Sequence, residues 1–172
     1  MMLGDGESLQ EHFAPASVCF GCGPANPDGL HVRSFPDPER ADGLIARWSP
    51  APYHHAFASV LNGGIIGAIL DCHANWAAAM AIMRADRAHR PPATVTADYA
   101  VRLLAPTPTD APLTIRAWSV EVAGRRALSE AHIETADGTV TATFSGRFVA
   151  VRDDHPAHDR WNAGTGPVPG AG

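Results

Sequence analysis

Residues 64–85 form a long apolar stretch without proline, rich in alanine, isoleucine, leucine and methionine. Its large apolar side chains recur at steps of three and four residues, which places them on one broad face of a helix. Few polar residues remain for the other faces, so we expect the rest of the protein to wrap around this helix. The residues on the apolar face are Ile65, Ile69, Cys72, Trp76, Met80 and Met83.

Segments on both sides of this helix alternate between apolar and polar positions, as strands do. Short links containing glycine or proline join most of them, so strands that follow one another should be antiparallel neighbours. The pattern predicts two strands, one buried helix and four strands, an α+β fold in which the helix packs against one curved antiparallel sheet. The expected strands are 30–35, 44–48, 94–104, 113–122, 126–135 and 139–151.

The chain of 172 residues suits one compact domain, and we see neither an internal repeat nor a second domain boundary. Residues 1–17 lack periodicity and are expected to be an irregular lead-in, whereas residues 18–152 form the domain. Residues 153–172 are rich in His, Pro and Gly, so we expect a flexible tail that buries little.

Composition narrows the possible functions. The formal net charge of −5 disfavours nucleic-acid binding, because such proteins are usually basic. All 13 basic residues are arginine, which excludes Schiff-base chemistry on lysine and a Walker A loop. Three cysteines argue against a disulfide framework, and the first residues are acidic rather than signal-like. We expect a cytoplasmic protein with neither a membrane span nor a nucleic-acid partner.

The start of the helix is suited to binding negative charge. Asn62 is a plausible N-cap, and Gly63 and Gly64 would leave first-turn amides open to a ligand. The helix dipole favours negative charge at these amides, so they could stabilise an oxyanion. The alternative is that Asn62, Gly63 and Gly64 only form a turn that caps the helix.

Asp71 lies about two turns inside the helix, between Leu70 and Cys72. A carboxylate in such an apolar run needs a partner or a task; a structural bond to backbone or to Thr96 would suffice. Eight residues at 1.5 Å each separate it from Gly63 by about 12 Å, too far for both to reach one carbonyl carbon. If they act together, Asp71 must come from a second subunit, which predicts a dimer.

The run from Asn62-Gly63-Gly64 to Leu70-Asp71 resembles the "HGG…D" signature of hot-dog-fold thioesterases of the PaaI-like group. Residues 19–30 (CFGCGPANPDGL) resemble the N-terminal segment of many members, and 95–99 (VTADY) resembles the strand after the central helix. The resemblance covers residues 18–151. It implies a hot-dog fold, with a curved sheet around the helix, and acyl-CoA thioester hydrolysis in a homodimer or a higher oligomer such as a tetramer.

The same resemblance implies roles for single residues. The amide of Gly63 or Gly64 would polarise the thioester carbonyl, Asp71 would be general base or nucleophile, and Thr96 would hold the water or the aspartate. His54 or His55 would border the thioester, and Asn62 replaces a histidine that is usually structural in the family. No cofactor is implied, and the acyl or aryl-acyl group is not specified.

Other groups have plainer explanations. Cys19 and Cys22 form a C-x-x-C pair, which is typical of zinc and redox sites. A structural zinc site requires four ligands, and the other candidates are irregularly spaced along the sequence: Cys72, His12 and His31. We therefore expect a tight glycine-shaped loop and no metal. Adjacent residues on a helix point in different directions, so Cys72 and His73 form no dyad. Trp76 belongs to the core or lines an acyl-binding tunnel, and the arginines at 84, 87, 90, 125 and 126 are solvated or meet CoA phosphates.

Two other functions remain open. A hot-dog module that binds acyl-CoA or another apolar ligand without turnover is favoured by the replacement at Asn62. A dehydratase or hydratase usually needs a catalytic histidine paired with a carboxylate, and no clear pair is present at a matching position. We rank that enzyme class last.

Overall fold

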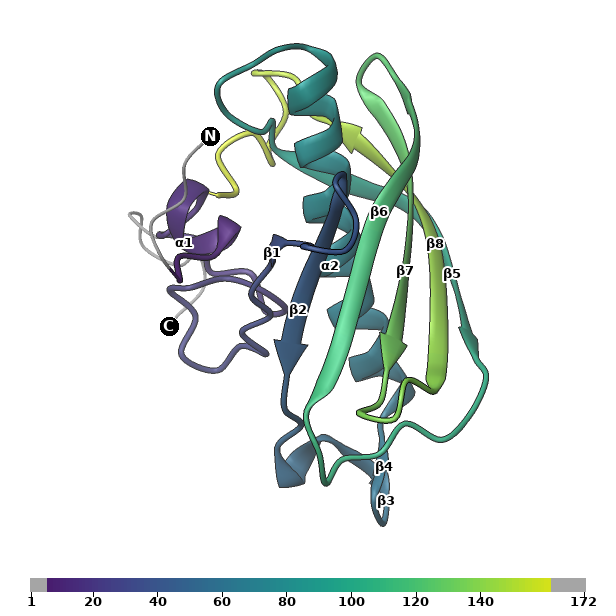
Figure 1. The fold of residues 1–172 in the computed structure, drawn as a ribbon. Helices are drawn as coiled ribbons and strands as arrows, with labels where there is room; N and C mark the ends of the chain where they lie inside the picture. Colours follow the sequence, from purple (N-terminus) through teal and green to yellow (C-terminus); the bar gives the residue numbers. More distant parts are fainter. Residues whose placement is uncertain (1–5, 162–172) are drawn as a thin grey trace.

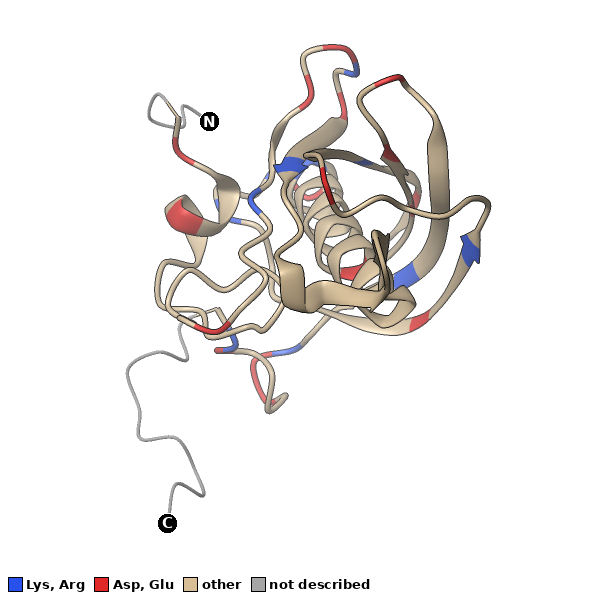
Figure 2. Cartoon of the chain, turned by 90° about the horizontal axis from the view of Figure 1, so that it is seen from below, with Lys and Arg blue, Asp and Glu red and all other residues tan. Residues whose placement is uncertain are grey.

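The computed structural model describes residues 6–161. One long helix, α2 (Gly63–Ala85), packs against a six-stranded antiparallel sheet of order β1-β2-β6-β7-β8-β5 (Figure 1). The strands of the sheet are β1 (Phe35–Pro36), β2 (Gly43–Trp48), β5 (Thr94–Leu103), β6 (Leu113–Ala123), β7 (Arg126–Glu134) and β8 (Val140–Ala150). Viewed along α2, the strands curve around it, and acidic and basic residues are interspersed over the loops and strands (Figure 2). The predicted α+β hot-dog architecture is confirmed.

The core lies between α2 and the sheet. Ile69, Leu70 and Ile82 of the helix are fully buried against Ile115 and Ile133 of the sheet. Each such side chain contributes about 1.5–3 kcal/mol on burial. By length and composition α2 could cross a membrane, but 83% of its most apolar window is buried inside the protein, so the core accounts for its hydrophobicity.

The N-terminal region is more ordered than its sequence suggested. Ser8 and Glu11 form a capping box that starts α1 (Leu9–Phe13), and Leu9 and Phe13 are buried. The lead-in expected to be irregular therefore contains a docked helix. Of the expected strand 30–35, only Phe35 lies in a strand, β1, because residues 30–34 run along the core without a partner strand.

A buried polar network joins the N-terminal region to α2. The side-chain oxygen of Gln10 accepts from the amide of Ser34, and the Ser34 hydroxyl bonds Nδ1 of His73 at 2.8 Å. Nε2 of His73 lies 3.2 Å from the carbonyl of Leu44. Burial lowers the pKa of His73 to about 4, so the ring is neutral at pH 7.

The described part of the expected tail, residues 153–161, is anchored at its end. Trp161 is 7% exposed and stacks on Trp76 of α2 at 4.4 Å between ring centroids. Arg160 donates to the carbonyl of Thr94. Residues 162–172 of the expected flexible tail lie outside the described residues.

Candidate functional site

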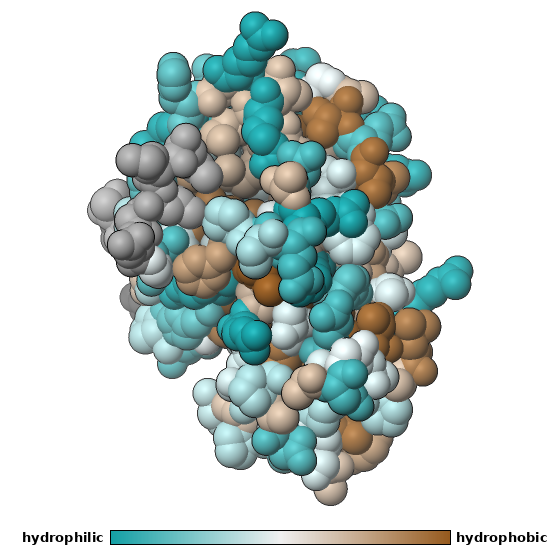
Figure 3. Space-filling view, viewed as in Figure 1, coloured by the Kyte–Doolittle hydropathy of each residue, from teal (hydrophilic) through white to brown (hydrophobic). Residues whose placement is uncertain are grey.

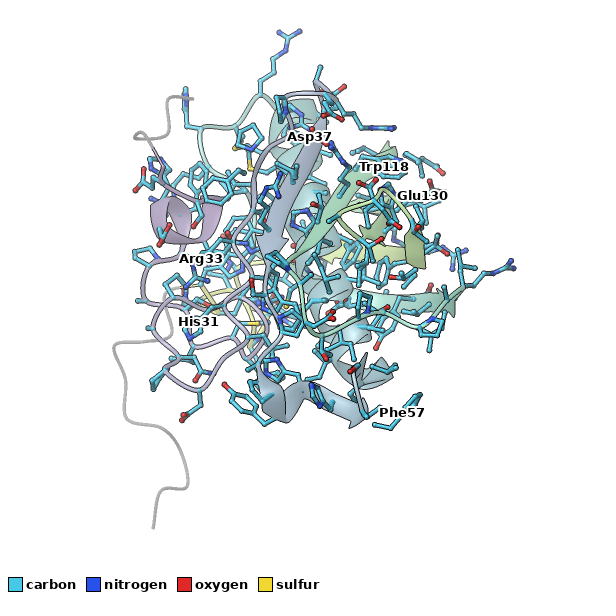
Figure 4. The ribbon with its side chains drawn as sticks, turned by 60° about the horizontal axis from the view of Figure 1, so that its bottom comes forward. His31, Arg33, Asp37, Phe57, Trp118 and Glu130 are labelled. Atoms are coloured by element: carbon cyan, nitrogen blue, oxygen red, sulfur yellow. The ribbon has the colours of Figure 1, made fainter. Side chains whose placement is uncertain are left out.

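A short loop positions the first turn of α2. The 3-10 turn η1 (Pro52–His54) leads into a small hairpin, β3 (His55–Phe57) and β4 (Val60–Leu61), which the sequence analysis did not anticipate. The amide of Asn62 donates to the carbonyl of His54 at 2.9 Å, which fixes where the helix begins. Figure 4 shows Phe57, the last residue of β3, at the lower edge of the molecule.

Asn62 caps α2 as expected. Its backbone is extended (φ −63°, ψ 132°), and its side-chain oxygen accepts from the amide of Gly64 at 2.8 Å. The amide of Gly64 is thus already bonded. Among residues 6–161 the amide of Gly63 has no acceptor, and Gly63 is exposed. Gly63 therefore offers the freer donor of the two glycines.

One face of α2, with residues four apart, lies along β5. A Cβ atom at Gly63 would lie 3.5 Å from Leu103, and one at Gly67 would lie 3.7 Å from the hydroxyl of Tyr99. Two turns from the helix start, the Thr96 hydroxyl donates to Oδ1 of Asp71 at 2.8 Å. We call this face, made by Gly63, Gly67 and Asp71, the glycine–aspartate face.

Strand β5 is at the edge of the sheet and pairs only with β8 in the described chain. Its register shifts between Thr96 and Asp98, a bulge of the kind that re-aims side chains. Tyr99 is 51% and Leu103 59% exposed, although each covers a glycine of α2. Figure 3 shows exposed hydrophobic side chains in small groups between hydrophilic ones on the face seen in Figure 1. An unpaired edge bearing apolar side chains can pair with another chain.

Asp71 is half-buried, and burial is the largest influence on its pKa, which is raised. The hydrogen bond from Thr96 and the charge of Arg160 oppose this rise. Among the described residues, Oδ2 of Asp71 has no hydrogen-bond partner. Because every buried side-chain oxygen or nitrogen of these residues has a partner, Oδ2 must be open to solvent. A carboxylate with a raised pKa and one open oxygen can accept a proton from water.

His54 and His55 border the helix start, as expected, but His54 is bonded within its own loop and His55 to the connection between β5 and β6. Nδ1 of His54 accepts from the amide of Ala51 at 2.9 Å, and its ring stacks on Trp48. Burial, with a smaller contribution from His55, lowers the pKa of His54. Nε2 of His55 lies 2.9 Å from the hydroxyl of Thr109. These contacts favour a role in shaping the loop.

Trp76 is 2% exposed and its indole is covered by Trp161, so a ligand could reach it only by displacing the tail. The arginines considered for CoA lie away from the helix start. Arg84 pairs with Asp42, Arg90 donates to the carbonyl of Phe13, and Arg125 donates to that of Ala150.

Sequence reasoning missed three neighbours of the glycine–aspartate face. Tyr99 and Leu103 lie at a spacing of four along β5, and their exposure could not be read from the sequence. Arg160 belongs to the segment expected to be flexible. A hollow of about 490 Å³ is lined by residues such as Ala97, Asp98 and Arg147 and by neither Asp71 nor Gly63. In a single chain Gly63 is exposed and Asp71 half-buried on the glycine–aspartate face, whereas Gly67 is buried.

Comparison with known proteins gives the fold. No family model and no curated protein matches the chain. One thioesterase superfamily structure superposes with a TM-score of 0.62 and 24% identity, over 75% of this chain and 61% of its own length. A thioesterase superfamily protein from Shewanella loihica gives 0.59 and 26% identity, over 75% of this chain and 98% of that one.

The PaaI protein of the E. coli phenylacetic acid degradation operon gives a TM-score of 0.56 and 14% identity, over 64% of this chain and 74% of its own. The present chain thus spans 61% of the first of these proteins and most of the other two. The chain has the hot-dog fold of these thioesterase superfamily proteins and of PaaI.

Proposed function

We propose that this protein is an acyl-CoA thioesterase whose site is shared by two protomers. The amide of Gly63 in one protomer polarises the thioester carbonyl, and Asp71 of the second activates water. The observation that carries the proposal is the glycine–aspartate face itself. It holds a free helix-start amide and a carboxylate of raised pKa about 12 Å apart, beside β5, an edge strand that pairs only with β8 among the described residues.

The chemistry follows from these groups. Asp71 takes a proton from water through its open oxygen while the resulting hydroxide attacks the carbonyl carbon. Negative charge develops on the carbonyl oxygen, where the Gly63 amide and the helix dipole stabilise it. The intermediate then expels CoA thiolate, which takes the proton back from Asp71, to give a carboxylic acid and free CoA.

Asp71 could instead attack the carbonyl itself. In that route the Asp71 carboxylate displaces CoA thiolate from the carbonyl carbon and forms an anhydride with the acyl group. Water then hydrolyses this anhydride, and the thiolate takes up the proton that is released. The hydroxyl of Thr96 holds Oδ1 in either route and leaves Oδ2 to react. Gly64 contributes through the backbone geometry of the first turn, since its own amide is bonded to Asn62.

Pairing of two β5 edges would bring the glycine–aspartate faces of two chains together, because the face and the edge lie side by side. Tyr99 and Leu103 would then leave solvent and border the acyl group, with Asn62, His54 and His55 at the rim. Trp76 would contact an acyl chain only if Trp161 moved. A tetramer built from such dimers and a cytoplasmic location belong to the same proposal.

The test is hydrolysis of a panel of short, long and aryl acyl-CoA esters, with release of free CoA measured. The signal from the three protein thiols must be subtracted. Asp71→Asn keeps the size of the side chain and should abolish turnover, whereas Asp42→Asn, an exposed aspartate paired with Arg84, should not. Turnover that survives Asp71→Asn removes this residue from the mechanism.

A second candidate function is acyl-CoA binding without hydrolysis. The bond from Gly64 to the Asn62 side chain favours it, because it leaves one open amide where two would make a stronger oxyanion site. Saturable binding of every panel member with no release of CoA would select this function.

A further inference from the structure

The structure brings all three cysteines together on one side of α2. Cys19 and Cys22 come from the N-terminal loop of residues 17–34, and Cys72 comes from the helix. Their sulfur atoms lie within 4.8 Å of one another, and those of Cys19 and Cys72 are 3.7 Å apart. In Figures 1 and 2 this loop lies beside α2, away from β7 and β8.

These spacings match a metal–thiolate site. A tetrahedral zinc ion binds sulfur at about 2.3 Å, which puts two of its thiolates about 3.8 Å apart. The Cys19–Cys72 pair already has this separation, and the other pairs need to close by an ångström at most. Among residues 6–161 no other group of three or more histidine, cysteine or acidic side chains is placed to share a metal ion.

Glycines allow the loop to reach the helix. A Cβ atom at Gly21 would lie 2.3 Å from the sulfur of Cys72, so only glycine lets the loop pass so close. A Cβ atom at Gly23 would lie 2.4 Å from the backbone nitrogen of Cys19, while the real Gly23 amide donates to the Cys19 carbonyl at 2.8 Å. Arg33 fixes the loop by donating to the carbonyl of Cys22.

The trio of thiols can be reached from one side. Cys22 and Cys72 are buried and Cys19 is half-buried, so a metal ion could enter on the Cys19 side.

We infer that Cys19, Cys22 and Cys72 form a zinc site that ties the N-terminal loop to α2, with a fourth position open to a small ligand on the Cys19 side. This inference does not depend on the proposed function. It departs from the sequence expectation of a metal-free loop, because the structure brings Cys72 next to the C-x-x-C pair. His12 and His31, the other candidates, bond Glu7 and Arg33 instead, and Figure 4 shows His31 and Arg33 near one another.

The test uses the full chain, made metal-free and kept reduced without air. Zn²⁺ is titrated in competition with a chromophoric chelator, and Co²⁺ is added as a spectroscopic probe. We expect one ion per chain and thiolate-to-cobalt charge-transfer bands. Cys19→Ser and Cys72→Ser should each weaken zinc binding by about 100-fold or more, because altering groups outside the ligand set already costs 10–100-fold.

His12→Gln and His31→Gln are the matched controls and should leave zinc affinity unchanged. Should Cys72→Ser fail to fold, as judged by circular dichroism, Cys19→Ser carries the test, because that side chain is half-buried. Absence of charge-transfer bands in the reduced protein would overturn the inference, as would zinc affinity unchanged by Cys19→Ser. A disulfide within the trio in air, with no zinc bound by the reduced form, would make the cluster a redox element instead.

Discussion

A single substitution can remove the amide hydrogen that is proposed to stabilise the oxyanion. Gly63→Pro deletes the amide hydrogen of the first helical residue, where proline is well tolerated. Asn62 already has the extended backbone that a following proline requires (φ −63°, ψ 132°). A Cβ atom at Gly63 meets only Leu103, at an ordinary contact distance of 3.5 Å. The fold should therefore accept this change.

The size of the effect follows from the state of that amide. It has no acceptor among the described residues, so its removal breaks no structural hydrogen bond. Loss of one oxyanion donor typically lowers kcat by about 10²–10³-fold, or about 2.7–4 kcal/mol of transition-state stabilisation. Stability should be unchanged or slightly higher, because proline restricts the unfolded chain by about 0.4–1 kcal/mol.

Gly63→Ala is the matched control, since it adds the same Cβ atom and keeps the amide. Steady-state hydrolysis of the best acyl-CoA substrate and urea denaturation would be measured for both variants. We expect Gly63→Pro to lose kcat with a native unfolding midpoint, and Gly63→Ala to keep most of its kcat. Full activity in Gly63→Pro, or equal losses in both variants, would refute the role of this amide.

Three further predictions concern groups around the core and the site. Burial lowers the pKa of His73 from 6.5 to about 4 in the folded protein. As the pH falls, the unfolded chain therefore takes up a proton on this histidine before the folded protein does, and the free energy of unfolding decreases. His73 should contribute a loss of about 2 kcal/mol between pH 7 and 5, measured as the difference in urea stability between the wild type and His73→Gln; equal pH dependence would contradict it. Thr96→Val removes a bond that lowers the pKa of Asp71, so the acidic limb of kcat/KM against pH should move upward, whereas Thr96→Ser should leave it in place. Trp161→Ala should lower the free energy of unfolding in urea by about 3–5 kcal/mol, because it removes a buried ring and exposes Trp76; an unchanged midpoint would show that the tail adds no stability.

The helix and the long strands could be predicted because their periodicity is strong and local. The cap at Asn62 and the buried helix face were visible for the same reason. Helix α1 was not predicted from the sequence, although Ser8 and Glu11 have the spacing of a capping box, because a helix of five residues is too short to show a hydrophobic periodicity. Segment 30–35 alternates like a strand, but no strand pairs with residues 30–34.

The surroundings of the site depend on contacts between distant segments. The sequence offered Thr96 as one possible partner for Asp71, whereas Tyr99, Leu103 and Arg160 had no such signal. The three thiols come from segments about 50 residues apart, and no spacing rule links them. Sequence patterns report burial along one element well, but they do not report which side chains meet across elements.

The most direct test of a shared site mixes two inactive variants. Gly63→Pro and Asp71→Asn chains are unfolded together, refolded and assayed. A mixed dimer would hold one site in which the glycine and the aspartate are both intact, so random pairing should restore about a quarter of wild-type activity. Each variant refolded alone should stay inactive. A mixture that also stays inactive, although mixed dimers have formed, would contradict a site built from two chains.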